Sequence, residues 1–257
     1  MATRTKAPVG APCWVDLWTS DVGGAQEFYS QLLGWEAQEP SEEFGGYFMF
    51  HRDGVPIAGG MGDMGDMRAN DTWKVYLCVE DAKETFAVAG AQGAELFGDP
   101  MPVADLGIQG VLTDPTGASV GAWQPGTFPG FSVLGEPGAP AWFELLTHDF
   151  DRAVEFYRSV FGWELDVLSD TEAFRYTVAR DADGNQFAGV MDASKLPSSG
   201  APSMWTVYWD VDSVDAAAMS VVKLGGTVQD GPVDTDYGRM VFATDPFGAR
   251  FNLHSST

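Results

Sequence analysis

The sequence contains few cysteines, few basic residues and no long apolar run. Its two cysteines, Cys13 and Cys78, are too few for a disulfide scaffold or a cysteine-rich zinc module. No apolar stretch approaches the roughly 20 residues that a membrane-spanning helix needs. The N-terminal segment lacks the apolar centre of a secretory signal. We therefore expect a soluble, reduced, cytoplasmic protein.

Basic residues are far outnumbered by acidic ones. The chain has 14 Lys and Arg against 37 Asp and Glu, which gives a net charge of −23. Such a charge repels phosphate groups, so we expect neither nucleic acid nor a membrane surface as a partner. The 257 residues are 45% hydrophobic and 13% aromatic. This composition supports a folded core, and the length suggests about two domains.

The chain repeats itself with an offset of 128 residues. When residues 14–36 are aligned with residues 142–164, 11 of the 23 pairs are identical. Later in each copy, Asp114-Pro-Thr-Gly matches Asp245-Pro-Phe-Gly. A period of this length indicates a duplicated domain rather than a solenoid. We predict one domain at residues 1–125 and another at 140–257, joined by a Pro- and Gly-rich linker at 126–139.

Each copy contains two β-α-β-β-β patterns. In the first copy, residues 14–19 alternate as a strand, Asp21 suits a helix N-cap, and Gly34 suits the left-handed residue that ends the helix. Apolar residues recur at helical spacing between these two caps. Further strands are predicted at 35–38, 47–51 and 57–61, and the pattern restarts at residue 73 with a helix at 82–90. The predicted fold class is therefore α+β.

The strand–Asp–helix–Phe-Tyr openings and the Asp-Pro-x-Gly turns resemble the vicinal oxygen chelate superfamily. Its members include glyoxalase I, bleomycin-resistance proteins, fosfomycin-resistance enzymes and extradiol dioxygenases. The chain is most similar to two-domain actinobacterial members labelled glyoxalase-like or hydroxylase, over about residues 10–125 and 138–255. The resemblance implies two tandem glyoxalase-like domains, each made of paired βαβββ units whose curved mixed sheets surround a cavity.

Metal-using members of this superfamily place His, Gln or Glu on the first and last strands of each unit. The matching positions here carry poor ligands: Trp14, 58–60, Lys74 and Gly121 in the first copy, and Trp142, 188–190, Thr206 and Asn252 in the second. A divalent metal prefers imidazole, thiolate or carboxylate. We therefore expect no cofactor and no metal at the usual site. This argues against orthodox glyoxalase I, extradiol dioxygenase and fosfomycin-transferase chemistry.

Because strand side chains alternate, a Trp14 that faces the cavity would place Asp16 on the same face. The same alternation along the matching strands predicts an aromatic wall with a few polar groups, which suits a small-molecule ligand. The candidate ligand-binding residues are Trp14, Trp18, Lys74, Tyr76, Trp123, Trp142, His148, Tyr208, Asn252 and His254. His148 and His254 could form an acid–base pair, or they could be exposed and idle.

Asp16 and Glu144 hold equivalent positions, each two residues after a tryptophan. A carboxylate among indole rings is poorly solvated, so its pKa rises and it suits general acid–base catalysis. Alternatively, the two carboxylates accept hydrogen bonds from Tyr76 and Tyr208 and hold the strands together.

Three functions remain open. The first is a small-molecule-binding protein that sequesters or processes a natural product or a reactive carbonyl compound. The second is a glyoxalase-like lyase, isomerase or hydroxylase-type enzyme with Asp16 or Glu144 as general base. The third is a non-catalytic interaction protein. We expect a monomer or a homodimer.

Overall fold

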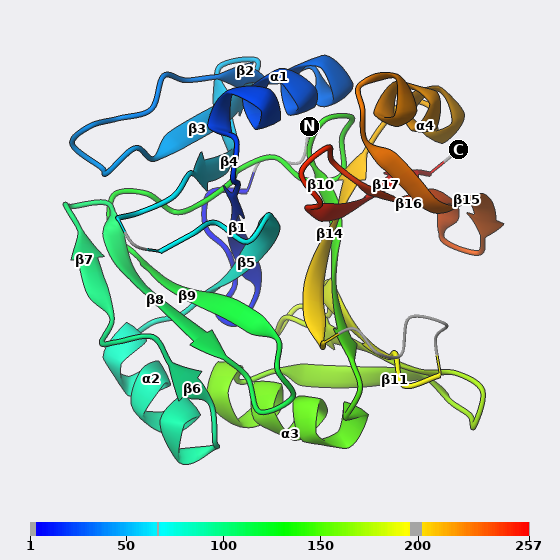
Figure 1. Cartoon of the computed structure of the whole chain (residues 1–257). Coiled ribbons are helices and arrows are strands. Elements are labelled where there is room, and N and C mark those ends of the chain that lie inside the picture. The colour runs from blue at the N-terminus through cyan, green and yellow to red at the C-terminus, as the bar shows by residue number, and fades with distance from the viewer. Residues whose placement is uncertain (1–3, 66, 196–201, 257) are drawn as a thin grey trace.

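The computed structural model describes residues 4–65, 67–195 and 202–256. In these ranges the strands form two mixed sheets, one in each half of the chain, and the helices lie against them (Figure 1). The first half contains β1 (Pro12–Trp18), α1 (Val22–Leu33), β2 (Glu36–Ala37), β3 (Phe48–Arg52), β4 (Val55–Met61), β5 (Thr72–Cys78), α2 (Ala82–Ala91), β6 (Glu95–Leu96), β7 (Met101–Val103), β8 (Gly107–Thr113) and β9 (Ser119–Pro125). The second half contains β10 (Pro140–Thr147), α3 (Phe150–Phe161), β11 (Glu164–Asp170), β12 (Arg175–Arg180), β13 (Gln186–Asp192), β14 (Met204–Asp210), α4 (Val214–Lys223), β15 (Thr227–Thr235), β16 (Gly238–Thr244) and β17 (Arg250–Ser255). None of the helices in the described ranges has the length and apolar character needed to cross a membrane.

Each sheet consists of two βαβββ units that meet along their first strands. In the first half, β1 pairs antiparallel with β5 and parallel with β4, and the strand order is β2-β3-β4-β1-β5-β9-β8-β6. The second half repeats this order as β11-β12-β13-β10-β14-β17-β16-β15. The predicted α+β fold with tandem glyoxalase-like domains is therefore confirmed. The short β7, which pairs with β8, lies outside the predicted pattern.

The first helix of each half begins and ends at the residues that the sequence indicates. The Asp21 and Asp149 carboxylates each accept a hydrogen bond from an amide in the first helical turn, at 2.9 and 3.2 Å. Gly34 and Gly162 end these helices with φ angles of 71° and 69°, in the left-handed region that glycine adopts without a Cβ clash. These local signals fix where each helix begins and ends.

The two halves pack against each other through the helix-covered sides of their sheets. The α1 and α4 helices meet at one end of this interface, and α2 and α3 meet at the other (Figure 1). Between these helix pairs, β5 of the first half contacts β14 of the second. Trp35 and Trp73 both pack edge-to-face on Trp209, with ring centroids 4.7 and 5.3 Å away. The interface is therefore part of the hydrophobic core.

A reciprocal pair of hydrogen bonds crosses the same interface. The Tyr29 hydroxyl on α1 donates to Asp245 Oδ2 in the second half (3.1 Å), and the Tyr157 hydroxyl on α3 donates to Asp114 Oδ2 in the first half (2.9 Å). All four residues are buried. The Phe-Tyr and Asp-Pro-x-Gly motifs shared by the two copies therefore meet here, and each copy supplies the tyrosine for the other copy's aspartate.

The segment between the two sheets packs closely against both halves. The Phe128 ring lies edge-to-face on Trp14, with centroids 4.8 Å apart, and the Phe128 carbonyl accepts a hydrogen bond from Trp123 Nε1 (2.9 Å). Phe131 stacks on Phe143 of β10, with centroids 5.6 Å apart and planes 6° apart. The Pro- and Gly-rich stretch thus carries aromatic anchors on either side of its turns.

Candidate functional site

The candidate site residues lie on the face of each sheet opposite the helices, which we call the front face. On β1, Val15 and Leu17 are fully buried in the hydrophobic core, so strand alternation directs Trp14 and Asp16 to the front face. On β10, the buried Phe143 and Leu145 direct Trp142 and Glu144 to the equivalent face. The two carboxyl groups therefore occupy matching positions in the two halves.

Asp16 lies in a hydrogen-bonded chain of aromatic side chains. The Tyr47 hydroxyl donates to Asp16 Oδ1 (2.7 Å) and accepts from Trp14 Nε1 (2.8 Å). Burial raises the pKa of the Asp16 carboxyl, and hydrogen bonds from Tyr47 and Tyr76 partly oppose this rise. Lys74 is the register partner of Asp16 on β5. The carboxyl is thus held by phenol hydroxyls next to one basic side chain.

Glu144 has the same type of surroundings. The Tyr208 hydroxyl donates to Glu144 Oε2 (2.8 Å), and Trp142 Nε1 donates to the Tyr176 hydroxyl (3.1 Å). Burial raises the pKa of the Glu144 carboxyl, and hydrogen bonds from Tyr208 and Tyr176 partly oppose this rise. A cluster of one carboxyl, two tyrosines and one tryptophan is therefore duplicated in the two halves.

Tyr47 and Tyr176 were absent from the sequence-based site. Each lies two strands away from its carboxyl group, because the strand order β3-β4-β1 recurs as β12-β13-β10. The two tyrosines hold equivalent positions of the repeat, at an offset of 129 residues, so their identity is a signal in the sequence, and the strand order brings them to the front face. The alternative prediction was that Tyr76 and Tyr208 donate hydrogen bonds to the two carboxylates. It is confirmed for Tyr208, whose hydroxyl donates to Glu144.

The two front faces differ in how far they are covered. In the first half, Trp14 lies against Phe128 and is only 5% exposed. In the second half, Trp142 is only half-buried. The exposed ring of Phe174 stacks on Tyr176, with centroids 5.7 Å apart and planes 11° apart. The second half therefore presents an accessible aromatic surface above a buried carboxyl.

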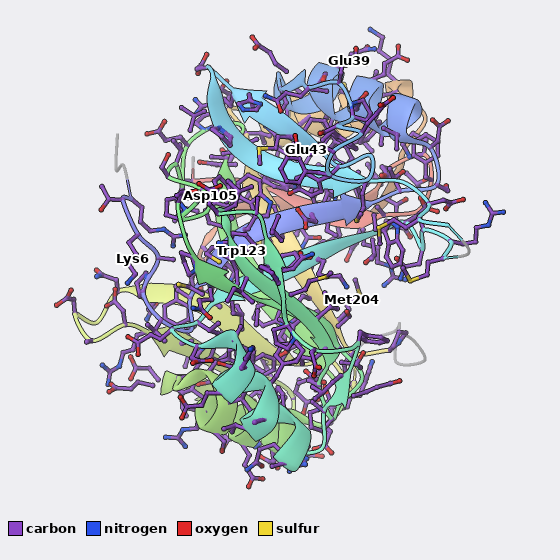
Figure 2. The ribbon with its side chains drawn as sticks, turned by 90° about the vertical axis from the view of Figure 1, so that its left-hand side faces the viewer. Lys6, Glu39, Glu43, Asp105, Trp123 and Met204 are labelled. Carbon is purple, nitrogen blue, oxygen red and sulfur yellow. The ribbon has the colours of Figure 1, made fainter. Side chains whose placement is uncertain are left out.

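Other candidate residues are held by local hydrogen bonds. Trp18 Nε1 and Trp123 Nε1 each donate to a backbone carbonyl at 2.9 Å, and Asn252 Nδ2 donates to Thr206 Oγ1 (3.1 Å). Figure 2 shows Trp123 in the middle of the first half, on the side of the molecule that carries β8 and β9. These contacts are within the protein and do not test ligand binding, so the ligand-binding role of these residues stays a prediction.

His148 and His254 do not lie together. His254 is the register partner of Asp210, with Nδ1 3.5 Å from the Asp210 carboxylate, and its Nε2 is 2.8 Å from the Tyr237 carbonyl oxygen. Burial raises the pKa of Asp210, and His254 opposes this rise. His148 follows the last residue of β10, which runs antiparallel to β14. The hypothesis of a His148–His254 acid–base pair is wrong, because the two side chains lie at opposite strand ends.

Tyrosine side chains approach glycine backbones at the positions where metal-using superfamily members carry ligands. A side chain at Gly59 would overlap the Tyr47 hydroxyl, and one at Gly189 would overlap the Tyr176 hydroxyl. Across the part of the chain that the structure describes, no group of three or more His, Cys, Asp or Glu is placed to hold a metal ion. One carboxyl with phenols and an indole does not fit the donor set that a divalent ion prefers. Metal-free function stays a prediction.

A cavity of about 340 Å³ lies between the two halves. Its walls come from the first residues of β5 and β14 and from the segments around the two Asp-Pro-x-Gly turns. Lys74 of the candidate site lines it, whereas Asp16 and Glu144 do not. The sequence did not predict this cavity, because it depends on how the two copies pack against each other.

Comparisons with known proteins agree with this geometry. The model of the glyoxalase/bleomycin resistance protein/dioxygenase superfamily matches residues 139–253, and a glyoxalase-like domain model matches residues 14–121. The anthracycline biosynthesis protein DauV of Streptomyces sp. (strain C5) is 33% identical over 266 residues, covering 97% of this chain and 94% of DauV. The putative glyoxylase CFP32 of Mycobacterium tuberculosis (strain CDC 1551 / Oshkosh) is 32% identical over 258 residues, covering 98% of this chain and 97% of CFP32.

A solved structure with the same fold is the Mn(II)-bound glyoxalase from Novosphingobium aromaticivorans. The two superpose with a TM-score of 0.65 at 18% identity, covering 97% of this chain and 83% of that one. This likeness concerns the fold alone, whereas the matches to DauV and CFP32 extend over nearly the whole sequence. The chain belongs to the glyoxalase/bleomycin resistance protein/dioxygenase superfamily.

Proposed function

We propose that the protein binds a planar aromatic small molecule on the front face of its second half. The observation that carries this proposal is the exposed Phe174 ring stacked on Tyr176, next to the half-buried Trp142. Flat ligands gain dispersion and quadrupole energy when they stack on such rings. The equivalent face of the first half has Phe128 over its tryptophan, so the second half is the working site.

Glu144 and Tyr208 supply polar contacts at the base of this aromatic surface. The raised pKa of Glu144 means that its carboxyl takes up a proton more readily than an exposed one. A protonated carboxyl donates a hydrogen bond to a carbonyl oxygen, and an ionised one accepts a hydrogen bond from a phenol. A fused-ring ligand that carries carbonyl and phenol groups would therefore match both states.

The name of one relative favours this class of ligand. DauV is an anthracycline biosynthesis protein, and anthracyclines contain a flat fused-ring system with quinone carbonyls and phenol hydroxyls. Such a compound presents both the stacking surface and the polar edge that Trp142, Tyr176 and Glu144 would recognise. In this function the protein sequesters a natural product or presents it for processing.

Titration with the anthracycline daunorubicin, followed by the ligand's own fluorescence, tests the proposal. We expect Trp142→Leu and Glu144→Gln each to weaken binding about tenfold or more, the loss expected for one good contact. Asp16→Asn is the matched control, because it makes the same kind of change on the covered face. Equal weakening by Asp16→Asn, or unchanged binding by both Trp142→Leu and Glu144→Gln, would refute the proposal.

A glyoxalase-like enzyme is the second candidate. It is favoured by the name of CFP32, a putative glyoxylase, and by two buried carboxyl groups with raised pKa. Asp16 or Glu144 would then remove a proton from a carbon next to a carbonyl group. Turnover of the methylglyoxal–glutathione hemithioacetal, lost in the Asp16→Asn/Glu144→Gln double variant, would support this function. Absence of turnover by the unmodified protein would contradict it.

A further inference from the structure

The cavity between the two halves has the size and wall chemistry of a ligand site. Its volume of about 340 Å³ falls at the lower end of the roughly 300–1,000 Å³ that small-molecule pockets occupy. The first half contributes Lys74 and Ser119, and the second contributes Met204 and Arg250. Figure 2 labels Met204, which lies at the start of β14. None of Trp142, Glu144, Phe174 and Tyr176 lines the cavity, so it is separate from the aromatic surface of the second half.

Two basic side chains line this cavity with no carboxylate of the described residues within salt-bridge distance, although the Asp16 carboxyl on the neighbouring strand interacts with Lys74 at longer range. Lys74 Nζ donates to Ser119 Oγ (2.8 Å), and Arg250 Nη1 points to Met204 Sδ (3.7 Å). Both contacts are with residues of the same cavity wall. Among the described residues, neither Lys74 nor Arg250 takes part in a salt bridge.

The acidic residue of the cavity wall is already engaged. Asp71 Oδ1 accepts hydrogen bonds from the Ser20 amide (2.8 Å) and the Ser20 hydroxyl (3.0 Å). These bonds tie the segment before β5 to the end of β1 and hold one Asp71 oxygen toward Ser20. With Asp71 as the one acidic residue of the lining against Lys74 and Arg250, the cavity wall carries a net positive charge.

Other arginines on the second sheet behave differently. Arg175, Arg180 and Arg239 each form salt bridges with two carboxylates. Burial penalises the charged form of Lys74 and lowers its pKa. A bound anion would offset that penalty.

The rest of the wall has polar and apolar parts. Trp73, Pro202, Met204 and Trp205 form the apolar part beside the two basic groups. We propose that this interdomain cavity binds a small organic anion, an aromatic carboxylate whose charged group lies between Lys74 and Arg250 and whose ring lies against the tryptophan–methionine wall. Guanidinium groups pair well with carboxylates, and thioethers adapt to ring edges. The inference stands independently of the proposed function on the front face.

Calorimetric titration of the full chain with 2-naphthoate tests this site, with 2-naphthamide as the neutral twin of the same shape. We expect naphthoate to bind, to bind more weakly as salt rises, and to bind at least about tenfold more tightly than the amide. Lys74→Met and Arg250→Gln should each weaken naphthoate binding about tenfold or more. Arg250 is exposed, so its variant should fold even if Lys74→Met does not.

Lys83→Met and Arg158→Gln are matched controls, because they make the same substitutions at exposed positions on α2 and α3. They should leave naphthoate binding unchanged. Equal affinity for naphthoate and naphthamide, or equal weakening by the control and cavity variants, would overturn the proposal. So would inorganic phosphate binding as tightly as naphthoate, since the apolar wall would then contribute nothing. Binding of daunorubicin in Arg250→Gln should be unchanged, which separates this site from the front face.

Discussion

Replacing Tyr157 with phenylalanine should destabilise the protein strongly, although it removes a single oxygen atom. The Tyr157 hydroxyl donates to Asp114 Oδ2 (2.9 Å) and accepts from Trp205 Nε1 (2.8 Å). All three side chains are buried. The substitution leaves a carboxylate oxygen and an indole N–H without these partners, at a place that water does not reach.

The magnitude follows from these two groups. Each buried polar group left without a partner costs about 1–3 kcal/mol, so the loss of partners by two groups should lower the free energy of unfolding by roughly 2–6 kcal/mol. In a chain of this size such a loss lowers Tm by about 4–24 °C. Tyr29→Phe should have a similar effect, because Tyr29 makes the equivalent contacts with Asp245 and Trp73.

Urea unfolding followed by both tryptophan fluorescence and far-UV circular dichroism would measure the change. Coincident transitions would indicate that the two halves unfold together, as their shared core implies. The control is Tyr237→Phe, since Tyr237 is 65% exposed. A loss below about 0.5 kcal/mol for Tyr157→Phe would refute the reasoning, because that is the scale of an ordinary surface substitution.

Three further changes test the front faces. Gly189→Ala should cost about 1–3 kcal/mol in urea unfolding because its Cβ would overlap a tyrosine hydroxyl, whereas Gly23→Ala, whose Cβ would lie 3.8 Å from Asp21 Oδ1 in ordinary van der Waals contact, should cost nothing. Phe128→Ala should uncover Trp14 and raise the daunorubicin stoichiometry seen by calorimetry from one to two. The free energy of unfolding of Glu144→Gln, relative to that of the unmodified protein, should be highest at neutral pH. Because the pKa of Glu144 is raised in the folded state, its ionised form destabilises the fold. This penalty disappears as the pH falls through the folded pKa toward the unfolded value of about 4.3. The difference in free energy of unfolding between the two proteins should therefore shift in favour of the unmodified protein as the pH falls.

The helices and strands could be predicted because their signals are local. Asp21 satisfies amides only three residues away, and Gly34 ends the helix through its own φ angle. Because the second copy repeats these capping residues, the same helices and strands are predicted there. The fold class followed from the number and order of these elements, together with the resemblance of the repeated motifs to a known superfamily.

The site could be predicted only in part, because alternation along a strand says which face a residue occupies but not what lies opposite. Asp16 and Glu144 are on the predicted face. Tyr47 lies close to Asp16 because β3, β4 and β1 are neighbours in the sheet, and this strand order cannot be read from the alternation of residues in the sequence. The separation of His148 and His254 likewise depends on strand direction. The interdomain cavity depends on how the two copies pack together, so no single copy contains its signal.

The packing of the halves explains which residues the two copies share. Tyr29 of the first copy needs Asp245 of the second, and Tyr157 of the second needs Asp114 of the first. Loss of either residue of a pair removes a buried hydrogen-bond partner from the other half, so each residue depends on its partner in the other copy. On the front faces the cluster of carboxyl, tyrosine and tryptophan side chains is also common to both copies, and the copies differ there in what covers it. The shared Tyr–Asp pairs mark the interface, and differences such as Lys74 against Thr206 at the matching strand position are the places to seek ligands that one copy alone binds.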